Sequence, residues 1–331
     1  MKIKNISLAH GNGGSESKEL VEGLFYSVFG NKILNKSEDA ALIENGKLAF
    51  TTDSFTVNPL SFAGGDIGKL AICGTCNDLA VMGAKPKYLS IAFMIEEGFS
   101  FDELKSIIKS MHDELEKNDA IIVCGDTKVV PKGNVDKLFI NTTGIGEIYY
   151  SGISASNLKE GMSILISRDI GAHGAVVFAA REGMELSTEL KSDCASLYPQ
   201  VKSIVDGGVN IVAMRDATRG GIAAVLNEWA NASGITIEID ESKISISQEV
   251  QGICELLGFE ATALANEGTF VLAVPSEDAQ KALAILRQTH ESSAIIGSVN
   301  STYKGKVVLK SSWGTQRFLD LPTGELLPRI C

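Results

Sequence analysis

Short apolar runs and longer amphipathic stretches alternate along the first half of the chain. Runs of strand length occupy residues 47–54, 86–96, 120–124 and 138–147. Apolar runs of this length, bounded by polar residues, are typical of β-strands. The pattern therefore predicts a first domain in which strands alternate with helices.

Two helices are predicted between these strands. Residues 66–82 have a helical pattern, which Gly83 can end because glycine readily takes the left-handed conformation. Residues 100–118 give a stronger signal, since Ser100 and Glu103 form a capping box at their start. The apolar residues of this helix fall on one stripe: Leu104, Ile107, Ile108, Met111 and Leu115.

The second half begins after a polar, glycine-bearing stretch at residues 151–161, which is the predicted domain boundary. Its predicted strands are residues 163–168, 269–274 and 294–297, and its predicted helices begin at Ala172 and cover residues 221–233 and 276–289. The last β-α-β run is typical of an α+β layer. From Ser311 onward the periodicity is lost, and an arm without regular structure is expected.

The composition is that of a soluble globular protein. The chain has 331 residues, which suits two domains, with 44% hydrophobic and 21% charged residues. Its net charge of −11 argues against nucleic acid or an anionic membrane as partner, because phosphate contacts need clustered lysine and arginine. No apolar run approaches the ~20 residues that span a bilayer, and residues 1–14 show no export signal. The six cysteines lack a dense, paired spacing, so reduced thiols and a cytoplasmic location are expected.

Five aspartates are expected at the ends of apolar strands, followed by a turn or a helix. They are Asp39, Asp53, Asp78, Asp126 and Asp216. Side chains at the carboxyl ends of strands can converge on the crevice in which α/β sheets bind ligands. Converging carboxylates repel one another unless a hard cation lies between them, and Mg2+ with a phosphate chain meets that need. The open alternative is that each aspartate only caps a helix or starts a turn.

Residues 10–15, His-Gly-Asn-Gly-Gly-Ser, form a glycine-dense loop. Such a loop can bring backbone N–H groups close to phosphate oxygens. It is not a Walker A loop, because no Gly-Lys-Ser/Thr follows, and not a Rossmann fingerprint, because no strand precedes it. A flexible loop without a ligand is the alternative.

The chain ends on a cysteine, Cys331. A cysteine is a costly choice for an exposed last residue unless its thiol is used. The spacing is not a prenylation signal, which places the cysteine four residues from the end. A thiol on an arm stiffened by proline could be modified by one protein and then moved into a distant pocket. An accidental terminal cysteine is the alternative.

Two further polar residues are candidates. Lys128 follows Asp126 by two positions, so both would point to one side of an extended segment, where an ammonium group would stabilise phosphoryl transfer. Glu267 precedes an apolar strand and could be an acid or base. A surface salt bridge and a turn residue are the respective alternatives.

The remaining cysteines and histidines give weaker signals. Cys73 and Cys76 have the spacing of a redox or zinc pair but lie in a helical pattern without a second pair, so core positions are expected. Structural roles are also expected of Cys124, Cys194 and Cys254. His173 is expected to be a turn residue.

Taken in order, these segments resemble a superfamily of ATP-binding enzymes that includes aminoimidazole ribonucleotide synthetase, selenophosphate synthetase and thiamine-monophosphate kinase. The matching segments are residues 38–41 (Glu-Asp-Ala-Ala), 51–53 (Thr-Thr-Asp), 77–84 (Asn-Asp-Leu-Ala-Val-Met-Gly-Ala), 125–127 (Gly-Asp-Thr) and 216–221 (Asp-Ala-Thr-Arg-Gly-Gly). Within it the chain is most similar to the HypE family of carbamoyl dehydratases. This likeness depends on residues 9–14 (Ala-His-Gly-Asn-Gly-Gly), 125–130 (Gly-Asp-Thr-Lys-Val-Val) and the terminal Pro328-Arg-Ile-Cys331.

The resemblance implies an α/β (α+β) fold of the aminoimidazole ribonucleotide synthetase type. The first-domain sheets of two protomers would pair into a barrel across a homodimer, with ATP in clefts beside that interface. The implied parts are a glycine-rich lid segment (1–40), an ATP-binding and dimerisation domain (41–150), a C-terminal α/β domain (151–310) and a mobile tail (311–331).

The resemblance also implies the chemistry and the partners. A HypF-type carbamoyltransferase would load a carbamoyl group onto Cys331, the tail would swing inward, and ATP would phosphorylate the carbamoyl oxygen. Loss of a proton from nitrogen and departure of phosphate would leave an S-cyanated cysteine. The cyanide would pass to iron on a HypC–HypD-type scaffold complex, for the active site of a NiFe hydrogenase.

Roles for individual residues follow from the resemblance. Cys331 would carry the substrate, Lys128 would stabilise the transferring phosphoryl group, and Glu267 would take or relay the N–H proton. ATP would be bound by His10, Gly11, Gly13, Gly14, Asp39, Asp53, Asp78, Asp126, Thr127 and Asp216, and Mg2+ by Asp39, Asp78, Asp126 and Asp216. The loop at residues 10–14 would close over the phosphates as a lid.

Two other functions stay open at this point. A sibling ATP-using enzyme, making selenophosphate or phosphorylating thiamine phosphate, would turn over a free metabolite and tolerate deletion of the tail. A non-catalytic thiol scaffold would not bind Mg-ATP measurably.

Overall fold

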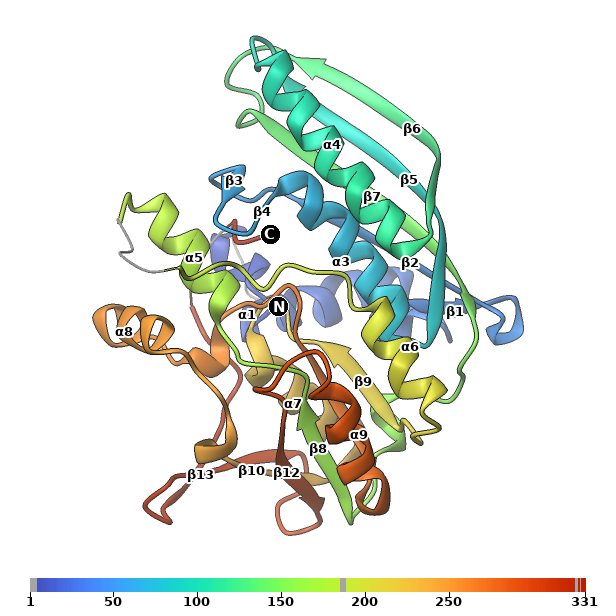
Figure 1. The fold of residues 1–331 in the computed structure, drawn as a ribbon, viewed down its shortest axis with the longest axis vertical. Coiled ribbons are helices and arrows are strands. Elements are labelled where there is room, and N and C mark those ends of the chain that lie inside the picture. Colours follow the sequence, from blue (N-terminus) through green and yellow to red (C-terminus); the bar gives the residue numbers. More distant parts are fainter. Residues whose placement is uncertain (1–4, 185–188, 325–326, 328) are drawn as a thin grey trace.

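The computed structural model describes residues 5–184, 189–324, 327 and 329–331. Pro328 of the terminal motif and the first four residues of the predicted lid segment lie outside the described residues. The described part contains two large β-sheets with helices packed on them (Figure 1). This arrangement confirms the predicted α/β class.

The first large sheet has five strands, all from the first half of the chain. Their order is β1 (Ala41–Ile43), β2 (Leu48–Phe55), β7 (Leu138–Ile148), β5 (Ala84–Glu96) and β6 (Ile121–Val130). Neighbouring strands are antiparallel except β5 and β6, which run parallel. Among the described residues, β6 forms one edge of this sheet and has no neighbour on its outer side.

Helices α3 (Ile67–Val81) and α4 (Phe101–Asn118) pack together, and α3 packs on the first sheet. Both start at the capping residues their sequences contain: Asp66 accepts a hydrogen bond from the Lys69 N–H, and Ser100 accepts one from the Glu103 N–H. Nearly every residue of α3 is buried, because elements of the second half cover its other side. This helix therefore joins the two halves of the molecule.

The second large sheet has seven strands, all from the second half. Their order is β14 (Gln316–Phe318), β13 (Lys306–Lys310), β10 (Thr236–Asp240), β12 (Ala294–Asn300), β8 (Met162–Ile166), β11 (Phe270–Pro275) and β9 (Ala213–Asp216). The helices of this half are α5 (Ala172–Arg181), α6 (Tyr198–Asp206), α7 (Gly221–Ser233), α8 (Gln248–Leu257) and α9 (Ala279–Leu286).

Strand β11 shows how the second sheet is buried on both faces. Val271 and Ala273 lie in the core that contains α7, whereas Leu272 and Val274 lie in the core that contains α6 and α9. Successive side chains of a strand point to opposite faces, so a strand covered on both faces is apolar at every position.

The predicted strand ends are wrong for most of the five aspartates. Strand β2 continues past Asp53 to Phe55, and β6 continues past Asp126 to Val130. Asp78 lies inside α3, and Asp39 precedes β1, so only Asp216 ends a strand. The turn-forming residues near Asp126 are held in a strand because each pairs with β5, and pairing overrides local propensity.

The second half also departs from the predictions. Strand β8 lies between β11 and β12, and α9 is shorter than predicted because its first residues form a separate 3-10 turn. The sequence analysis missed α6, α8, β10, β13 and β14. Strand β14 pairs with β13, so the segment predicted as an arm from Ser311 begins as part of the sheet.

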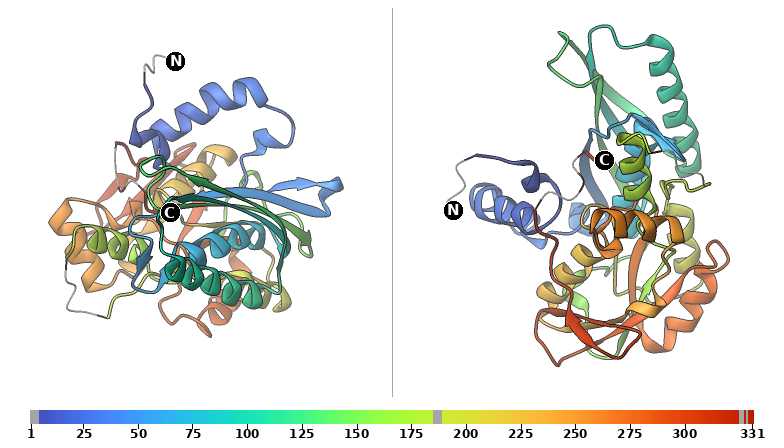
Figure 2. Two further views of the ribbon diagram at one scale, coloured as in Figure 1. Left: turned by 90° about the horizontal axis from the view of Figure 1, so that it is seen from above. Right: turned by 90° about the vertical axis from the view of Figure 1, so that its left-hand side faces the viewer.

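The two ends of the described chain lie in different surroundings. The N-terminal helices α1 (Ser15–Leu20) and α2 (Tyr26–Phe29) lie on the outside of the molecule (Figure 2). The C-terminus lies inside, close to α5 and the short hairpin of β3 (Ser61–Phe62) and β4 (Gly65–Asp66) (Figure 1). Among the described residues, no helix has both the length and the apolar character needed to cross a membrane.

Candidate active site

Three of the predicted aspartates meet where the two halves of the chain join. One carboxylate oxygen from each lies within 4.8 Å of the others, and we call these residues the acidic cluster: Asp39, Asp78 and Asp216. They come from the segment before β1, from α3 and from the end of β9. The buried helix α3 brings them together, because it touches both β2 and β9.

The acidic cluster is only partly neutralised. Asp39 pairs with the Arg215 guanidinium at 2.6 Å, and Asp78 accepts a hydrogen bond of 2.7 Å from the Thr51 hydroxyl. Oδ2 of Asp216 is buried and has no hydrogen-bond partner among the described residues. An unpaired buried carboxylate oxygen of this kind is costly unless a ligand satisfies it.

Burial raises the pKa of all three carboxyl groups. It raises the pKa of Asp39 and of Asp78 well above the usual value, and the neighbouring carboxylates add to the effect. Burial raises the pKa of Asp216 to about 6, although Arg215 opposes it. Carboxylates that are both desolvated and mutually repelling form a site suited to a hard cation.

A cavity of about 300 Å³ surrounds this cluster, and we call it the acidic cavity. Its wall also contains Gly13, Asp53 and Arg219. A second cavity of about 740 Å³ shares Glu38 and Thr51 with it, so the two are neighbours. The acidic cavity is the smaller and more acidic of the two, and the second cavity is the wider one.

The glycine-rich loop lies at the edge of the acidic cavity. Gly13 has φ +74°, and a Cβ there would lie 2.8 Å from the Arg219 carbonyl oxygen. A Cβ on Gly14 would lie 2.3 Å from the Pro322 carbonyl oxygen, whereas a Cβ on Gly11 would meet nothing within 4 Å. Two of these glycines are therefore required by close backbone packing. His10 points its ring at Ser7, with 2.9 Å between Nδ1 and Oγ.

Cys331 is partly buried, and its thiol interacts electrostatically with residues that line the same cavity. Burial raises the pKa of its thiol to about 12, the Arg219 guanidinium lowers it, and the Glu267 and Asp53 carboxylates raise it. Arg219 and Asp53 also line the acidic cavity, so the terminal sulfur lies within electrostatic reach of that cavity. At neutral pH the docked thiol is protonated.

Glu267 is buried close to Cys331. Burial raises the pKa of its carboxyl group well above the usual value, and the charges of Cys194 and Asp216 add to this. Its backbone is fixed by Asp193, whose Oδ1 accepts the Glu267 N–H at 3.0 Å and whose Oδ2 accepts the Gly268 N–H at 2.9 Å.

Asp126, Thr127 and Lys128 are not in this site within one chain. They lie on the edge strand β6 and are exposed, and the Lys128 ammonium pairs with Asp126 at 2.6 Å. That pairing lowers the pKa of Asp126. Their predicted roles stay predictions.

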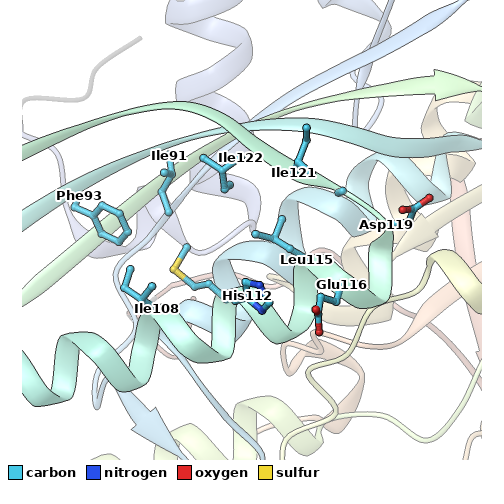
Figure 3. Close-up of a pocket in the computed structure, with 11 residues that line it drawn as sticks. Ile91, Phe93, Ile108, His112, Leu115, Glu116, Asp119, Ile121 and Ile122 are labelled. Carbon is cyan, nitrogen blue, oxygen red and sulfur yellow. The ribbon is translucent and has the colours of Figure 1, made fainter.

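Strand β6 also exposes apolar side chains. Ile121, Val123 and Val129 are each more than half exposed. Between β6, β5 and α4 lies an apolar hollow of about 700 Å³, into which Phe93, Ile108 and Leu115 point (Figure 3). Cys124 is exposed on this strand in the single chain, and the structural role expected of it stays a prediction, whereas Cys73 and Cys76 are buried as predicted.

Several residues of the site have no role in the sequence analysis. They are Thr51, Asp193, Arg215 and Arg219, together with His173, which is buried in α5. Arg219 belongs to the matching segment at residues 216–221, and Arg215 directly precedes it, so the sequence indicated both positions. Asp193 lies in an irregular segment whose sequence carries no such signal.

The chain matches two domain families. Residues 37–148 match the N-terminal domain of AIR synthase related protein, and residues 159–310 match its C-terminal domain.

Individual relatives are similar over the whole length. The carbamoyl dehydratase HypE of Escherichia coli strain K12 is 46% identical over 340 residues, covering 99% of this chain and 100% of that protein. A crystal structure of a HypE–HypF complex matches with a TM-score of 0.87 and 45% identity, covering 92% of this chain and 99% of that chain. A crystal structure of HypE in complex with ATP matches with a TM-score of 0.83 and 42% identity, covering 99% and 100%.

Proposed function

This chain belongs to the HypE family of carbamoyl dehydratases, and we propose that it uses ATP to dehydrate a carbamoyl group carried by Cys331 to a thiocyanate. The observation that carries this proposal is that the Cys331 thiol lies within electrostatic reach of Glu267 and of Arg219 and Asp53, two residues that line the acidic cavity. The product would supply cyanide for the maturation of a NiFe hydrogenase.

The acidic cluster fits Mg2+ bound to the phosphates of ATP. Its three converging carboxylates and the unpaired Oδ2 of Asp216 are oxygen ligands of the kind that this ion prefers. The ion would supply positive charge to the phosphate chain. Gly13 and Arg219, in the same wall, would lie against the phosphates, and the adjoining cavity has a volume suited to a nucleoside.

The dehydration needs the carbamoyl oxygen to become a leaving group. The γ-phosphoryl group is transferred from ATP to that oxygen, and ADP leaves. Loss of one proton from the carbamoyl nitrogen at this step gives a C=N bond. Loss of the second proton then forms the C≡N bond, while the C–O bond breaks and its electron pair leaves with phosphate. The partial burial of Cys331 would limit the access of water to this intermediate.

Glu267 is the proposed proton acceptor. Its raised pKa makes the ionised carboxylate a stronger base, and Asp193 holds its backbone in place. Asp53 and Arg219 interact electrostatically with Glu267, and both line the acidic cavity in which the phosphates would bind.

A second copy of the chain would complete the site. Strand β6 is an edge strand with exposed apolar residues, and such edges are normally covered. Pairing of two first sheets into a barrel would cover β6 and could bring Asp126, Thr127 and Lys128 to the cleft of the other protomer. This homodimer is supported by the apolar edge and by the hollow beneath it (Figure 3).

The homodimer can be tested with one charged residue. Val123→Glu, at an exposed position near the start of β6, is expected to give monomers in light scattering coupled to size exclusion. Leu256→Glu, on the exposed face of α8, should leave the dimer intact. A dimeric Val123→Glu protein would contradict the proposed interface.

Two partners are proposed for the same cysteine. A HypF-type carbamoyltransferase would load Cys331, and the HypE–HypF crystal structure at 45% identity supports this pairing. An iron scaffold complex of the HypC–HypD type would accept the cyanide, and a cytoplasmic location is proposed for all of them. Both exchanges require Cys331 to leave its inward position.

Intact mass spectrometry tests the proposed function directly. After incubation with the carbamoyltransferase, its carbamoyl donor and Mg-ATP, the protein should gain one carbamoyl group and then lose the mass of one water. Cys331→Ala should abolish both changes while Mg-ATP binding persists. Product formed by Cys331→Ala would contradict the proposal, and an absence of Mg-ATP binding would favour a thiol scaffold.

A further inference from the structure

The last three residues are bound mainly through their backbone. The carbonyl oxygen of Arg329 accepts from Arg181 at 2.8 Å and from the Asn58 N–H at 3.3 Å. The carbonyl oxygen of Ile330 lies 2.8 Å from Nε2 of His173. The terminal oxygen of Cys331 accepts from the N–H of Thr56 at 2.9 Å and from its hydroxyl at 3.1 Å. Each of three successive residues is thus fixed by a donor.

His173 is oriented to donate to the tail. The Ser192 hydroxyl oxygen accepts the Cys194 N–H at 3.0 Å, so its own proton is free to bond to Nδ1 of His173 at 2.7 Å. The other ring nitrogen therefore carries the proton and donates it to Ile330. The edge of the ring packs against Phe62, with 5.3 Å between ring centroids, and the side chain is fully buried.

Arg181 joins the tail to the first half of the chain. It stands at the end of α5, and its Nε donates to the Asn58 carbonyl oxygen at 3.0 Å while its second nitrogen binds Arg329. One side chain of the second half therefore holds together the loop after β2 and the tail.

Arg329 is the tail side chain that is recognised by charge. Its guanidinium donates to Asp136 at 2.5 Å and to the Thr56 carbonyl oxygen at 2.8 Å, and it lies 5.5 Å from the centre of the Phe139 ring. Its backbone has φ +53°, a conformation that non-glycine residues rarely take. These contacts fix the turn after which Ile330 is buried and Cys331 is partly buried.

We propose that His173 and Arg181 are positioning residues that hold the tail in its inward, reactive position, and that the Arg329–Asp136 pair selects this tail. The inference rests on the proposed function, because an inward tail matters only if Cys331 carries the substrate. These groups touch the backbone next to Cys331, so they place the sulfur without contacting it. Recognition through backbone and Arg329 leaves the thiol free to carry different groups.

The test measures how well docking protects Cys331 from alkylation by iodoacetamide. A synthetic peptide, Leu-Pro-Arg-Ile-Cys, in the same tube reports the rate for an undocked tail. The wild-type Cys331 is expected to react at least about tenfold more slowly than the peptide, since several hydrogen bonds to charged groups must break before it is exposed. Mass spectrometry of the C-terminal fragment gives both rates.

Variants should remove this protection. Arg181→Gln and Asp136→Asn are expected to speed alkylation of Cys331 by about three- to tenfold. His173→Gln keeps an N–H donor and should lose less protection than His173→Leu. Lys132→Gln, in the same loop as Asp136 but outside the tail contacts of the described residues, should behave as wild type.

A positioning role also predicts that a variant loses reaction rate without losing affinity for Mg-ATP. Conversion of carbamoylated Cys331 in a single turnover should slow in Arg181→Gln by the same factor by which protection is lost, while Mg-ATP affinity stays unchanged. Alkylation rates equal to wild type in both Arg181→Gln and Asp136→Asn, two partly exposed positions at which the fold should survive, would overturn the proposal. Protection without any thiocyanate in the wild type would instead refute the proposed function and leave the docking site standing.

Discussion

The acidic cluster and the site that binds the C-terminal tail, here called the acidic end and the tail end, differ in how completely their polar groups are paired. At the acidic end, three buried carboxylates crowd together and Oδ2 of Asp216 has no partner among the described residues. At the tail end, both ring nitrogens of His173 and one terminal oxygen of Cys331 have partners. Buried polar groups are normally satisfied, so the acidic end is suited to a ligand from outside the chain, whereas the tail end binds the chain's own C-terminus.

This difference separates two tasks. The acidic end is built for a ligand that arrives with its own positive charge, and the tail end is built for a segment of the same chain. Arg219 and Asp53 are shared, because both line the acidic cavity and both act on the charge of Cys331. Variants at each end should therefore separate nucleotide binding from presentation of the thiol.

The largest effect is expected from Glu267→Gln at the tail end. Removal of the proposed proton acceptor should slow thiocyanate formation by about 100-fold or more. Mg-ATP binding and the protection of Cys331 should persist, because the amide keeps the shape of the side chain. Single-turnover mass spectrometry measures the rate, and a rate within threefold of wild type would assign the proton transfer to another group.

Asp78→Asn at the acidic end should have the next largest effect. The ligand-free protein is expected to become more stable, because one of three repelling buried carboxylates is removed. Stabilisation by Mg-ATP, about 2.7 kcal/mol for the wild type at 100 times its Kd, should be lost. Thermal unfolding with and without Mg-ATP measures both changes.

Asp113→Asn is the matched control for that experiment. Asp113 belongs to the other group of possible metal ligands among the described residues, with His112 and Glu116 on the exposed face of α4. This variant should respond to Mg-ATP as the wild type does. A normal response in Asp78→Asn as well would mean that the acidic cluster does not hold the ion.

The smallest effect is expected from Asp53→Asn, between the two ends. Asp53 raises the pKa of the Cys331 thiol, so its removal should lower that pKa and increase the thiolate fraction at pH 8. Alkylation of Cys331 should then be roughly threefold faster throughout pH 7–11, a range that lies below the thiol pKa of about 12. Alkylation rates over pH 7–11 check the sign, and a slower reaction would contradict the shared electrostatic link.

The sequence was informative where a local pattern sufficed. The cap of α4 was predicted because Ser100 acts on a donor three positions away, whereas Asp66, which caps α3, was placed at the first position of the predicted helix. The aspartate-containing segments were found because each stands in a short recognisable motif, and the structure brings three of them together. Their role as metal ligands remains a prediction.

Other parts of the site depend on distant partners. Asp193 holds Glu267 from 74 positions away, and His173 reaches Ile330 across 157 positions. A histidine expected in a turn became a buried donor because α5 packs beside the docked tail. Asp126 was expected at a strand end, yet the pairing of β6 with β5 places it on an exposed edge.

The sequence by itself determined the periodic elements, the family and the cysteine at the end of the chain, because these depend on neighbouring residues. Tertiary structure alone decided which aspartates meet, which stay exposed on β6, and where Cys331 lies. The reason is physical: helix α3 is buried between the two halves, and its position carries Asp78 to Asp39 and Asp216. Contacts of that kind are set by packing across the whole chain, which no local pattern contains.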